Sequence, residues 1–385
     1  MVVPIAARDV AAGVGALLVI TAAVSEIGTL IVPRPIGSWL TRLVDRLVTG
    51  AFRVATGAIM HYRRRSDRVL PAQAAATADY RRRDRVLAAQ AAAILLAQLA
   101  AWLGMFFIGY SLLLWPFATD LTTAFTTAGP ALWEIGSSTV RGAAEHAIQD
   151  IASLTGIITV TLQIAYLPTL YSAFNRRENE VALLNARAGV PSWGPELLAR
   201  THYALGSGVS TIDTLPDLFE RWERWAADVA ESHATYLPLV RFRSPKPLSS
   251  WVTALLAVLD SAALFLALSP EEAPVVAARL CLRSGLLCFN EVARAMGIEI
   301  PDMPDRAAGI TLRYNEFLDA ITRMREVDFP IERTPEEAWP DFVGWRLNYE
   351  RAAYAVAAAV DAVPALWSGP RRYPTVPIPP IRPPK

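Results

Sequence analysis

Two long apolar runs without a charged residue constrain the fold of this chain more than any other feature. Residues 86–119 contain no Asp, Glu, Lys or Arg, and their apolar density is highest at 93–117; a second charge-free run covers residues 151–175. A helix rises 1.5 Å per residue, so about 20 apolar residues span a bilayer core of about 30 Å. We therefore expect both runs to be transmembrane helices.

The composition of the 385-residue chain also favours a membrane protein. Hydrophobic residues make up 53% of the chain and charged residues 19%, whereas about a quarter of a typical soluble domain is charged. The net charge of +1 argues against nucleic acid as a principal partner. We expect membrane lipid to be a partner of the chain.

A third apolar segment, residues 10–32, is predicted to be a transmembrane helix within an N-terminal region at residues 1–35. A cleaved signal peptide is the alternative, but the flank is weakly basic, the apolar core is long and no good cleavage site ends it. The one charged residue of this segment is Glu26. Intramembrane carboxylates are costly and tend to be functional. Glu26 could pair with an arginine of the basic segment that follows.

The segment at residues 36–92 is rich in arginine. Its first part, residues 39–60, spaces its apolar side chains as an amphipathic helix that lies against lipid headgroups would. The sequence at residues 62–76 recurs almost unchanged at residues 80–93. Two copies indicate a local tandem duplication, because a repeat fold needs about three units. We assign this repeat no function.

The distribution of arginine predicts how the chain is oriented in the membrane. Residues 36–92 are basic, and the third helix ends at Arg176 and Arg177, whereas residues 119–150 contain a single arginine, Arg141. The positive-inside rule then places the N-terminus outside, the basic segment inside, residues 119–150 outside and the C-terminal half in the cytosol. The expected location is a bacterial plasma membrane.

Residues 176–370 alternate helical patterns with proline-containing turns, which predicts a cytosolic all-α domain. Within it, residues 251–268 are apolar enough to resemble a membrane span. Asp260 lies at their centre and would cost roughly 2.5–3.5 kcal/mol in a bilayer. We expect a buried helix of the cytosolic domain instead.

Two smaller features complete the C-terminal half. Cys281 and Cys288 lie two helical turns apart, without a nearby His or a CxxC pair, and are expected to be apolar core residues. The tail at residues 371–385 is rich in proline and is expected to be disordered.

The connection between the second and third predicted transmembrane helices, residues 119–150, is too structured for a plain loop. Residues 121–133 have a helical pattern, and the Gly-containing segment 134–139 follows. A short helix and then extended backbone, between two transmembrane helices, is the layout of a re-entrant pore loop. We therefore predict a pore module at residues 93–175.

Several short segments spread over most of the chain carry a resemblance to known proteins. They are residues 29–34, 128–136, 163–171, 174–178, 184–189, 249–251 and 335–340. On these segments the chain resembles the bacterial potassium-channel-like family of two-transmembrane pore-loop proteins with a long cytosolic C-terminal domain. The resemblance implies a homotetramer that passes monovalent cations. It also implies a pore helix with Ala128, Leu132 and Trp133, and a filter of Glu134, Ile135, Gly136, Ser137 and Ser138.

The filter departs from the family pattern. Potassium filters read Thr-Val-Gly-Tyr-Gly, but this chain has Glu134 at the threonine position and Ser137 in place of the aromatic residue, while Ile135 and Gly136 are retained. A ring of four Glu134 carboxylates would attract cations without the carbonyl geometry that separates potassium from sodium. Repulsion within the ring would make conduction sensitive to pH. We therefore expect weak selectivity for potassium.

No set of residues indicates catalysis. The four histidines are scattered, and there is no nucleophile elbow or Walker loop, so we expect no enzymatic activity, no catalytic residue, no cofactor and no metal site. Besides the filter, the candidate functional residues are the intramembrane polar residues Glu26 and Gln163. The alternative to a channel is a non-conducting membrane anchor whose cytosolic domain binds a partner or ligand.

Overall fold

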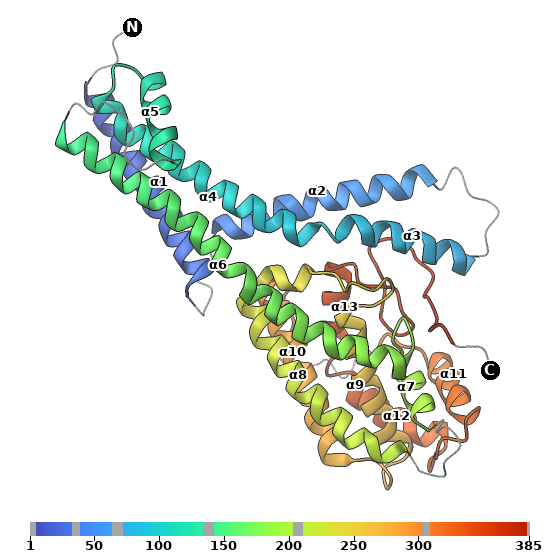
Figure 1. Ribbon diagram of the computed structural model, residues 1–385. Coiled ribbons are helices and arrows are strands. Elements are labelled where there is room, and N and C mark those ends of the chain that lie inside the picture. Colours follow the sequence, from blue (N-terminus) through green and yellow to red (C-terminus); the bar gives the residue numbers. More distant parts are fainter. Residues whose placement is uncertain are drawn as a thin grey trace. The chain divides into compact units, whose positions relative to one another are not determined.

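Helices are the regular elements of this chain, as the sequence predicts (Figure 1). The computed structural model describes residues 5–32, 39–63, 72–133, 142–202, 211–301, 303 and 309–382, and no strand is found within these ranges. The chain divides into two compact units. Unit 1 comprises residues 1–55 and 89–171, and unit 2 comprises residues 56–88 and 172–385.

Unit 1 contains the helices that the sequence predicts to be in the membrane. Its elements are α1 (Ile5–Leu30), the first part of α2 (Trp39–Arg63), α4 (Gln90–Leu114), the 3-10 helix η1 (Trp115–Phe117), α5 (Leu121–Trp133) and the first part of α6 (Ala143–Ala188). Pro116 has no backbone N–H to continue the α-helix, and α4 ends just before it. The helix predicted at 151–175 is longer at both ends, because α6 runs unbroken from Ala143 to Ala188.

Within the described residues, four helical stretches are long and apolar enough to span a membrane, which indicates a membrane location. They cover Ala6–Leu30, Ala72–Phe117, Ala143–Ala188 and Trp251–Leu268. In the first three, protein buries only 22% to 33% of the 18-residue apolar stretch that identifies the span. Leu17, Leu96 and Ile164 are 65%, 67% and 63% exposed. The fourth helix differs, because all of its residues are buried.

Unit 2 is built around the apolar helix α9, as the sequence predicts for residues 251–268. Its elements are the last parts of α2 and α6, together with α3 (Ala72–Leu87), α7 (Gly194–His202), η2 (Thr211–Thr214), α8 (Leu215–Thr235), η3 (Leu237–Arg241), α9 (Trp251–Leu268), α10 (Val275–Ala295), α11 (Tyr314–Arg325), α12 (Pro335–Arg346) and α13 (Glu350–Ala359). Five helices, α7, α8, α10, α12 and α13, contact α9. Cys281 and Cys288 on α10 are fully buried free thiols, which confirms their predicted place in the core.

Asp260 is compatible with the apolar helix α9 because it is paired inside the protein. Its carboxylate accepts hydrogen bonds from Arg346 of α12 and from the Tyr349 hydroxyl, the latter at 2.8 Å. Arg346 also donates to Glu350 at 2.6 Å and to the carbonyl oxygen of Trp367 at 2.8 Å. A buried charge is costly unless it is paired and hydrogen-bonded. This network therefore joins α9 to α12 and α13.

Residues 80–87 of the second copy of the repeated sequence lie at the end of α3, in unit 2. Tyr80 is 3% exposed there and packs in an apolar cluster. Arg83 is 2% exposed and pairs with Asp361. This part of the basic segment at residues 36–92 therefore packs against protein, while most of the first copy lies outside the described residues.

The two arginines at the predicted cytosolic exit of the third helix have different surroundings. Arg176 is exposed and pairs with Asp228 at 3.0 Å. Arg177 is fully buried and donates to the carbonyl oxygens of Leu239 and Phe242, both at 2.8 Å. Arg177 therefore anchors the C-terminal part of α6 within unit 2. The number of arginines in the sequence does not reveal this role.

The proline-rich tail is ordered over residues 371–382, contrary to the expected disorder. Arg371 is 9% exposed, and its guanidinium donates to the carbonyl oxygens of Ala362 at 2.7 Å and Val363 at 2.8 Å. Further along, Ile378 is 4% exposed. The composition of the tail does not reveal this order, because the hydrogen-bond partners of Arg371 are backbone carbonyls elsewhere in unit 2.

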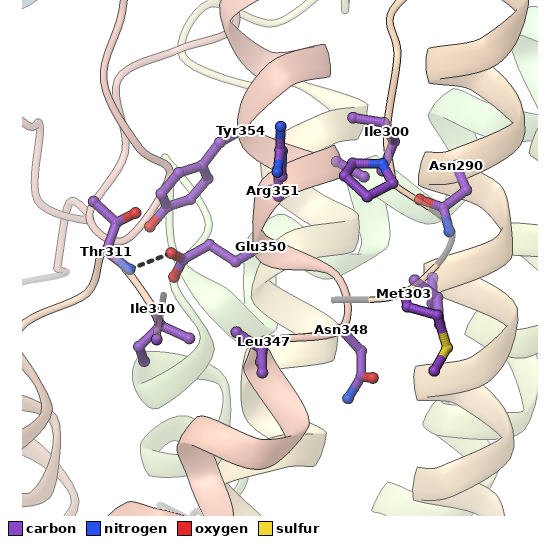
Figure 2. A pocket seen from close by; sticks show the side chains of 14 residues that line it. Asn290, Ile300, Met303, Ile310, Thr311, Leu347, Asn348, Glu350, Arg351 and Tyr354 are labelled. Carbon is purple, nitrogen blue, oxygen red and sulfur yellow. Dashed lines mark hydrogen bonds between the residues drawn. The ribbon is translucent and has the colours of Figure 1, made fainter. Parts of the chain in front are cut away.

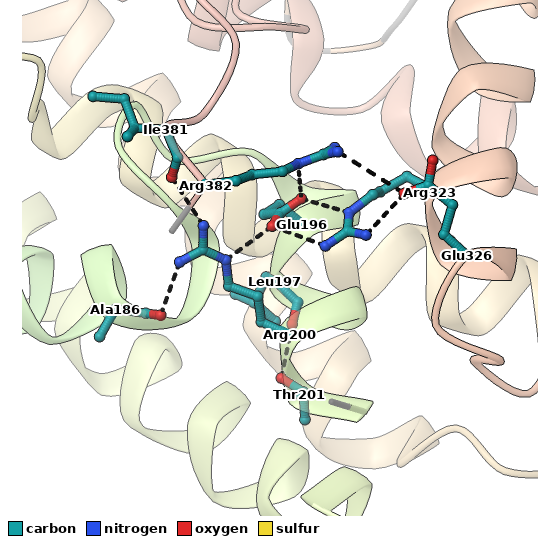
Figure 3. Close-up of polar contacts among 9 residues, drawn as sticks. All are labelled: Ala186, Glu196, Leu197, Arg200, Thr201, Arg323, Glu326, Ile381 and Arg382. Atoms are coloured by element: carbon teal, nitrogen blue, oxygen red, sulfur yellow. Dashed lines mark hydrogen bonds and ion pairs between the residues drawn. The ribbon is translucent and has the colours of Figure 1, made fainter. Parts of the chain in front are cut away.

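The end of the tail is held by arginines that surround Glu196 of α7 (Figure 3). Glu196 is 1% exposed and accepts hydrogen bonds from Arg200 at 2.9 Å and from Arg323 of α11 at 2.7 Å. Arg382 of the tail lies 3.3 Å from the same carboxylate. Burial alone would raise the pKa of Glu196, but hydrogen bonds from Arg323 and Arg200, together with nearby positive charge, hold it below its usual value.

Glu196→Gln is expected to lower the free energy of unfolding by about 3 kcal/mol at pH 7, because it leaves three guanidinium groups without their shared anion. The loss should shrink as the pH falls from about 5 to about 3. A carboxylate with a lowered pKa stabilises the folded state above its unfolded pKa of about 4.3 and loses this effect as it protonates. Urea unfolding of the full chain at several pH values measures both effects.

Glu299→Gln is the control for this prediction, because Glu299 is an exposed carboxylate of the same unit. Its effect should stay within about 0.5 kcal/mol. Equal losses for the two variants, or a loss that does not depend on pH, would contradict the role given to Glu196.

Candidate pore module

The short helix α5 packs against α4 through small and aromatic side chains. The rings of Phe125 on α5 and Phe107 on α4 have centroids 5.4 Å apart. Ala124 and Ala128 are fully buried, and small residues let neighbouring helices approach closely in a membrane. The helix predicted at residues 121–133 is confirmed, and Ala128 lies on its packed face.

The C-terminal end of α5 packs against α6. The Ser153 hydroxyl donates to the carbonyl oxygen of Ala131 at 2.6 Å. The carbonyl oxygen of Leu132 lies so close to Gly156 that a Cβ there would be 2.0 Å away. Ser153 and Gly156 follow Ala143, where α6 begins, by about 15–20 Å of helix. The end of α5 is therefore held beside the interior of a candidate membrane helix rather than beside its end.

Hydrogen bonds connect α4 to the two other long helices of unit 1. Tyr110 of α4 and Thr155 of α6 share a hydrogen bond of 2.7 Å. Trp102 of α4 donates through its indole N–H to the Ser25 hydroxyl of α1 at 3.0 Å. These contacts join α4 to α1 and to α6.

Glu26 lies within this helix bundle, not against the basic segment. The Thr159 hydroxyl of α6 donates to its Oε2 at 3.0 Å, which replaces the expected pairing with an arginine. Glu26 is 4% exposed, and its Oε1 has no hydrogen-bond partner among the described residues. Gln163, one turn further along α6, is 6% exposed and also has an unpartnered buried Oε1. Such atoms are uncommon in native proteins and call for an explanation.

The structure describes the predicted pore-helix residues but not the predicted filter residues. Ala128 and Leu132 are buried, at 0% and 1% exposed, whereas Trp133 is 59% exposed. The predicted filter, Glu134, Ile135, Gly136, Ser137 and Ser138, lies outside the described residues. Its assignment therefore stays a prediction from the sequence.

Sequence reasoning did not single out the two residues that hold α5 against α6, Ser153 and Gly156. A serine and a glycine three residues apart in an apolar helix were the available signal. Small and hydroxyl residues are enriched where membrane helices pack, because they allow close backbone approach and hydrogen bonding.

No known protein family matches this chain. Comparison with curated proteins and with solved structures also finds no match. Roles for the residues of the pore module therefore follow from the chain's own sequence and geometry.

Proposed function

We propose that this protein is a subunit of an oligomeric pore-loop cation channel in a bacterial plasma membrane. The observation that supports the proposal most is the position of α5, whose end packs against Ser153 and Gly156 inside α6. In this proposal α4 and α6 surround the pathway, α5 is the pore helix and residues 134–138 form the filter. The resemblance to bacterial potassium-channel-like proteins gives the same assignment.

Three of the four candidate spans, α1, α4 and α6, are the transmembrane helices of this proposal. A helix in contact with lipid needs apolar side chains on its outer surface, and these three helices expose them. Helix α9 exposes none, because protein buries all of it. The arginine distribution then places the N-terminus outside and unit 2 in the cytosol, where it serves regulation or assembly.

The proposed conduction relies on Glu134 rather than on a potassium filter. Around a fourfold axis, four carboxylates would concentrate cations at the outer end of the pathway. The altered filter favours weak discrimination between potassium and sodium. The unpartnered oxygens of Glu26 and Gln163 fit a pathway or subunit interface near α6, because polar groups in membrane helices usually face water or protein.

Glu134→Gln is expected to reduce cation flux severalfold and to weaken its dependence on pH, because it removes the charge of the ring. Flux into proteoliposomes, measured from pH 5 to pH 8, tests this. Glu145→Gln is the matched control, since Glu145 lies on the same outer connection but outside the proposed filter, and it should leave the flux unchanged. Unaltered flux in the Glu134 variant would remove this residue from the pathway.

The alternative is a non-conducting membrane anchor whose helical unit 2 binds a partner or ligand. The observation that favours it is a cavity in unit 2 between α10 and α13. A channel with a ligand-binding cytosolic domain would contain the same cavity, so ion flux separates the two functions.

A further inference from the structure

Unit 2 contains a cavity of about 640 Å³ beside α10 and α13 (Figure 2). Small-molecule sites usually measure about 300–1,000 Å³ and are mainly apolar, with a few polar groups that orient the ligand. The apolar walls here include Leu286, Ile310 and Leu347. The volume and the lining both fit a small organic molecule.

The one carboxylate among the lining residues is not open to a ligand. Glu350 accepts hydrogen bonds from the backbone N–H of Thr311 and from Arg346, the latter at 2.6 Å. Figure 2 shows this side chain turned toward Thr311. A carboxylate whose oxygens already have donors, one of them a guanidinium, is a weak site for a cationic ligand.

The groups that remain available are mainly hydrogen-bond donors. Arg351 is exposed at the cavity and has no partner among the described residues. The Tyr354 hydroxyl accepts a hydrogen bond from Arg346 at 2.8 Å, so its own proton is free to donate. Burial raises the pKa of Tyr354 to about 12, and this proton is therefore present at neutral pH.

Asn290 is the second observation that indicates a ligand. It lines the cavity from α10, and its buried side-chain oxygen has no hydrogen-bond partner among the described residues. A buried polar atom without a partner costs free energy. A ligand that carries an N–H or O–H group would satisfy it.

We infer that this cavity binds a small organic anion with an apolar body and one hydrogen-bond donor. Arg351 and the Tyr354 hydroxyl contact its acidic group, Leu286 and Ile310 contact its apolar body, and Asn290 accepts its donor. A carboxylate attached to an indole ring has this chemistry. The inference does not depend on conduction, because binding is measured directly.

Titration of indole-3-propionate into the full chain in lipid nanodiscs, with empty nanodiscs as the blank, tests the inference. We expect saturable binding to the wild type and much weaker binding of the neutral indole-3-propionamide. Arg351→Gln should raise the Kd of the carboxylate by about tenfold and leave that of the amide unchanged. Leu286→Trp, which narrows the apolar part of the cavity, should weaken binding of both compounds.

Arg283→Gln is the charge-matched control, because Arg283 is exposed on α10 but does not line the cavity. It should bind the carboxylate as the wild type does. Absence of saturable binding to the wild type, an unchanged Kd in Arg351→Gln, or an equal loss in Arg283→Gln would overturn the inference.

Discussion

Gly156→Ala is expected to displace α5 from α6 and to lower the stability of unit 1 by about 1–3 kcal/mol. The added Cβ would lie 2.0 Å from the carbonyl oxygen of Leu132, which belongs to the backbone and cannot rotate away. If α5 is the pore helix, ion flux should fall by an order of magnitude or more, because the filter that follows it would shift. Thermal unfolding in detergent and flux in liposomes measure the two effects separately.

Gly104→Ala is the matched control for this prediction. Gly104 lies inside α4, and a Cβ there would meet nothing within 4 Å. Alanine is favoured over glycine within a helix by roughly 0.5–1 kcal/mol, so this variant should be as stable as the wild type or slightly more stable. A Gly156→Ala variant that matches Gly104→Ala in stability would contradict the close packing of α5 on α6.

Arg346→Met is expected to lower the free energy of unfolding by about 3–5 kcal/mol, because it removes the charge that compensates two buried carboxylates. Asp260 and Glu350 are 1% and 5% exposed, and both are paired with this guanidinium. Asp260→Asn should cost less, since Arg346 would keep Glu350 as its partner. Urea unfolding followed by tryptophan fluorescence reports mainly on unit 2, which contains most of the 11 tryptophans.

Arg351→Met is the control for this second prediction, since Arg351 is an exposed arginine five residues further along the chain. It should change the stability by less than about 0.5 kcal/mol. A loss in Arg346→Met no larger than that of the control would show that the buried network does not stabilise α9.

The helices were predictable because their signals are local. The charge-free runs specify α4 and α6, and the pattern at residues 121–133 coincides with α5. Asp260 indicated that α9 is buried in protein, because the cost of a lone carboxylate in lipid outweighs the apolar character of its neighbours.

The errors arose where tertiary partners decide the structure. The tail at residues 371–382 is held by hydrogen bonds from Arg371 to backbone carbonyls and by the ion pair of Arg382 with Glu196. The composition of the tail reveals neither of these contacts. The partner of Glu26 is Thr159, more than a hundred residues further along the chain. Only part of the candidate site was predicted in position: α5 lies where its pattern indicates, whereas its contacts with Ser153 and Gly156 depend on how the helices pack.

Ion flux through the purified full chain in liposomes, with potassium and sodium gradients compared, tests the proposed channel most directly. We expect both ions to pass with little preference, with a flux that rises as Glu134 ionises and that falls in the Glu134→Gln variant. Absence of flux for both ions across pH and voltage would contradict the channel and would favour the membrane anchor.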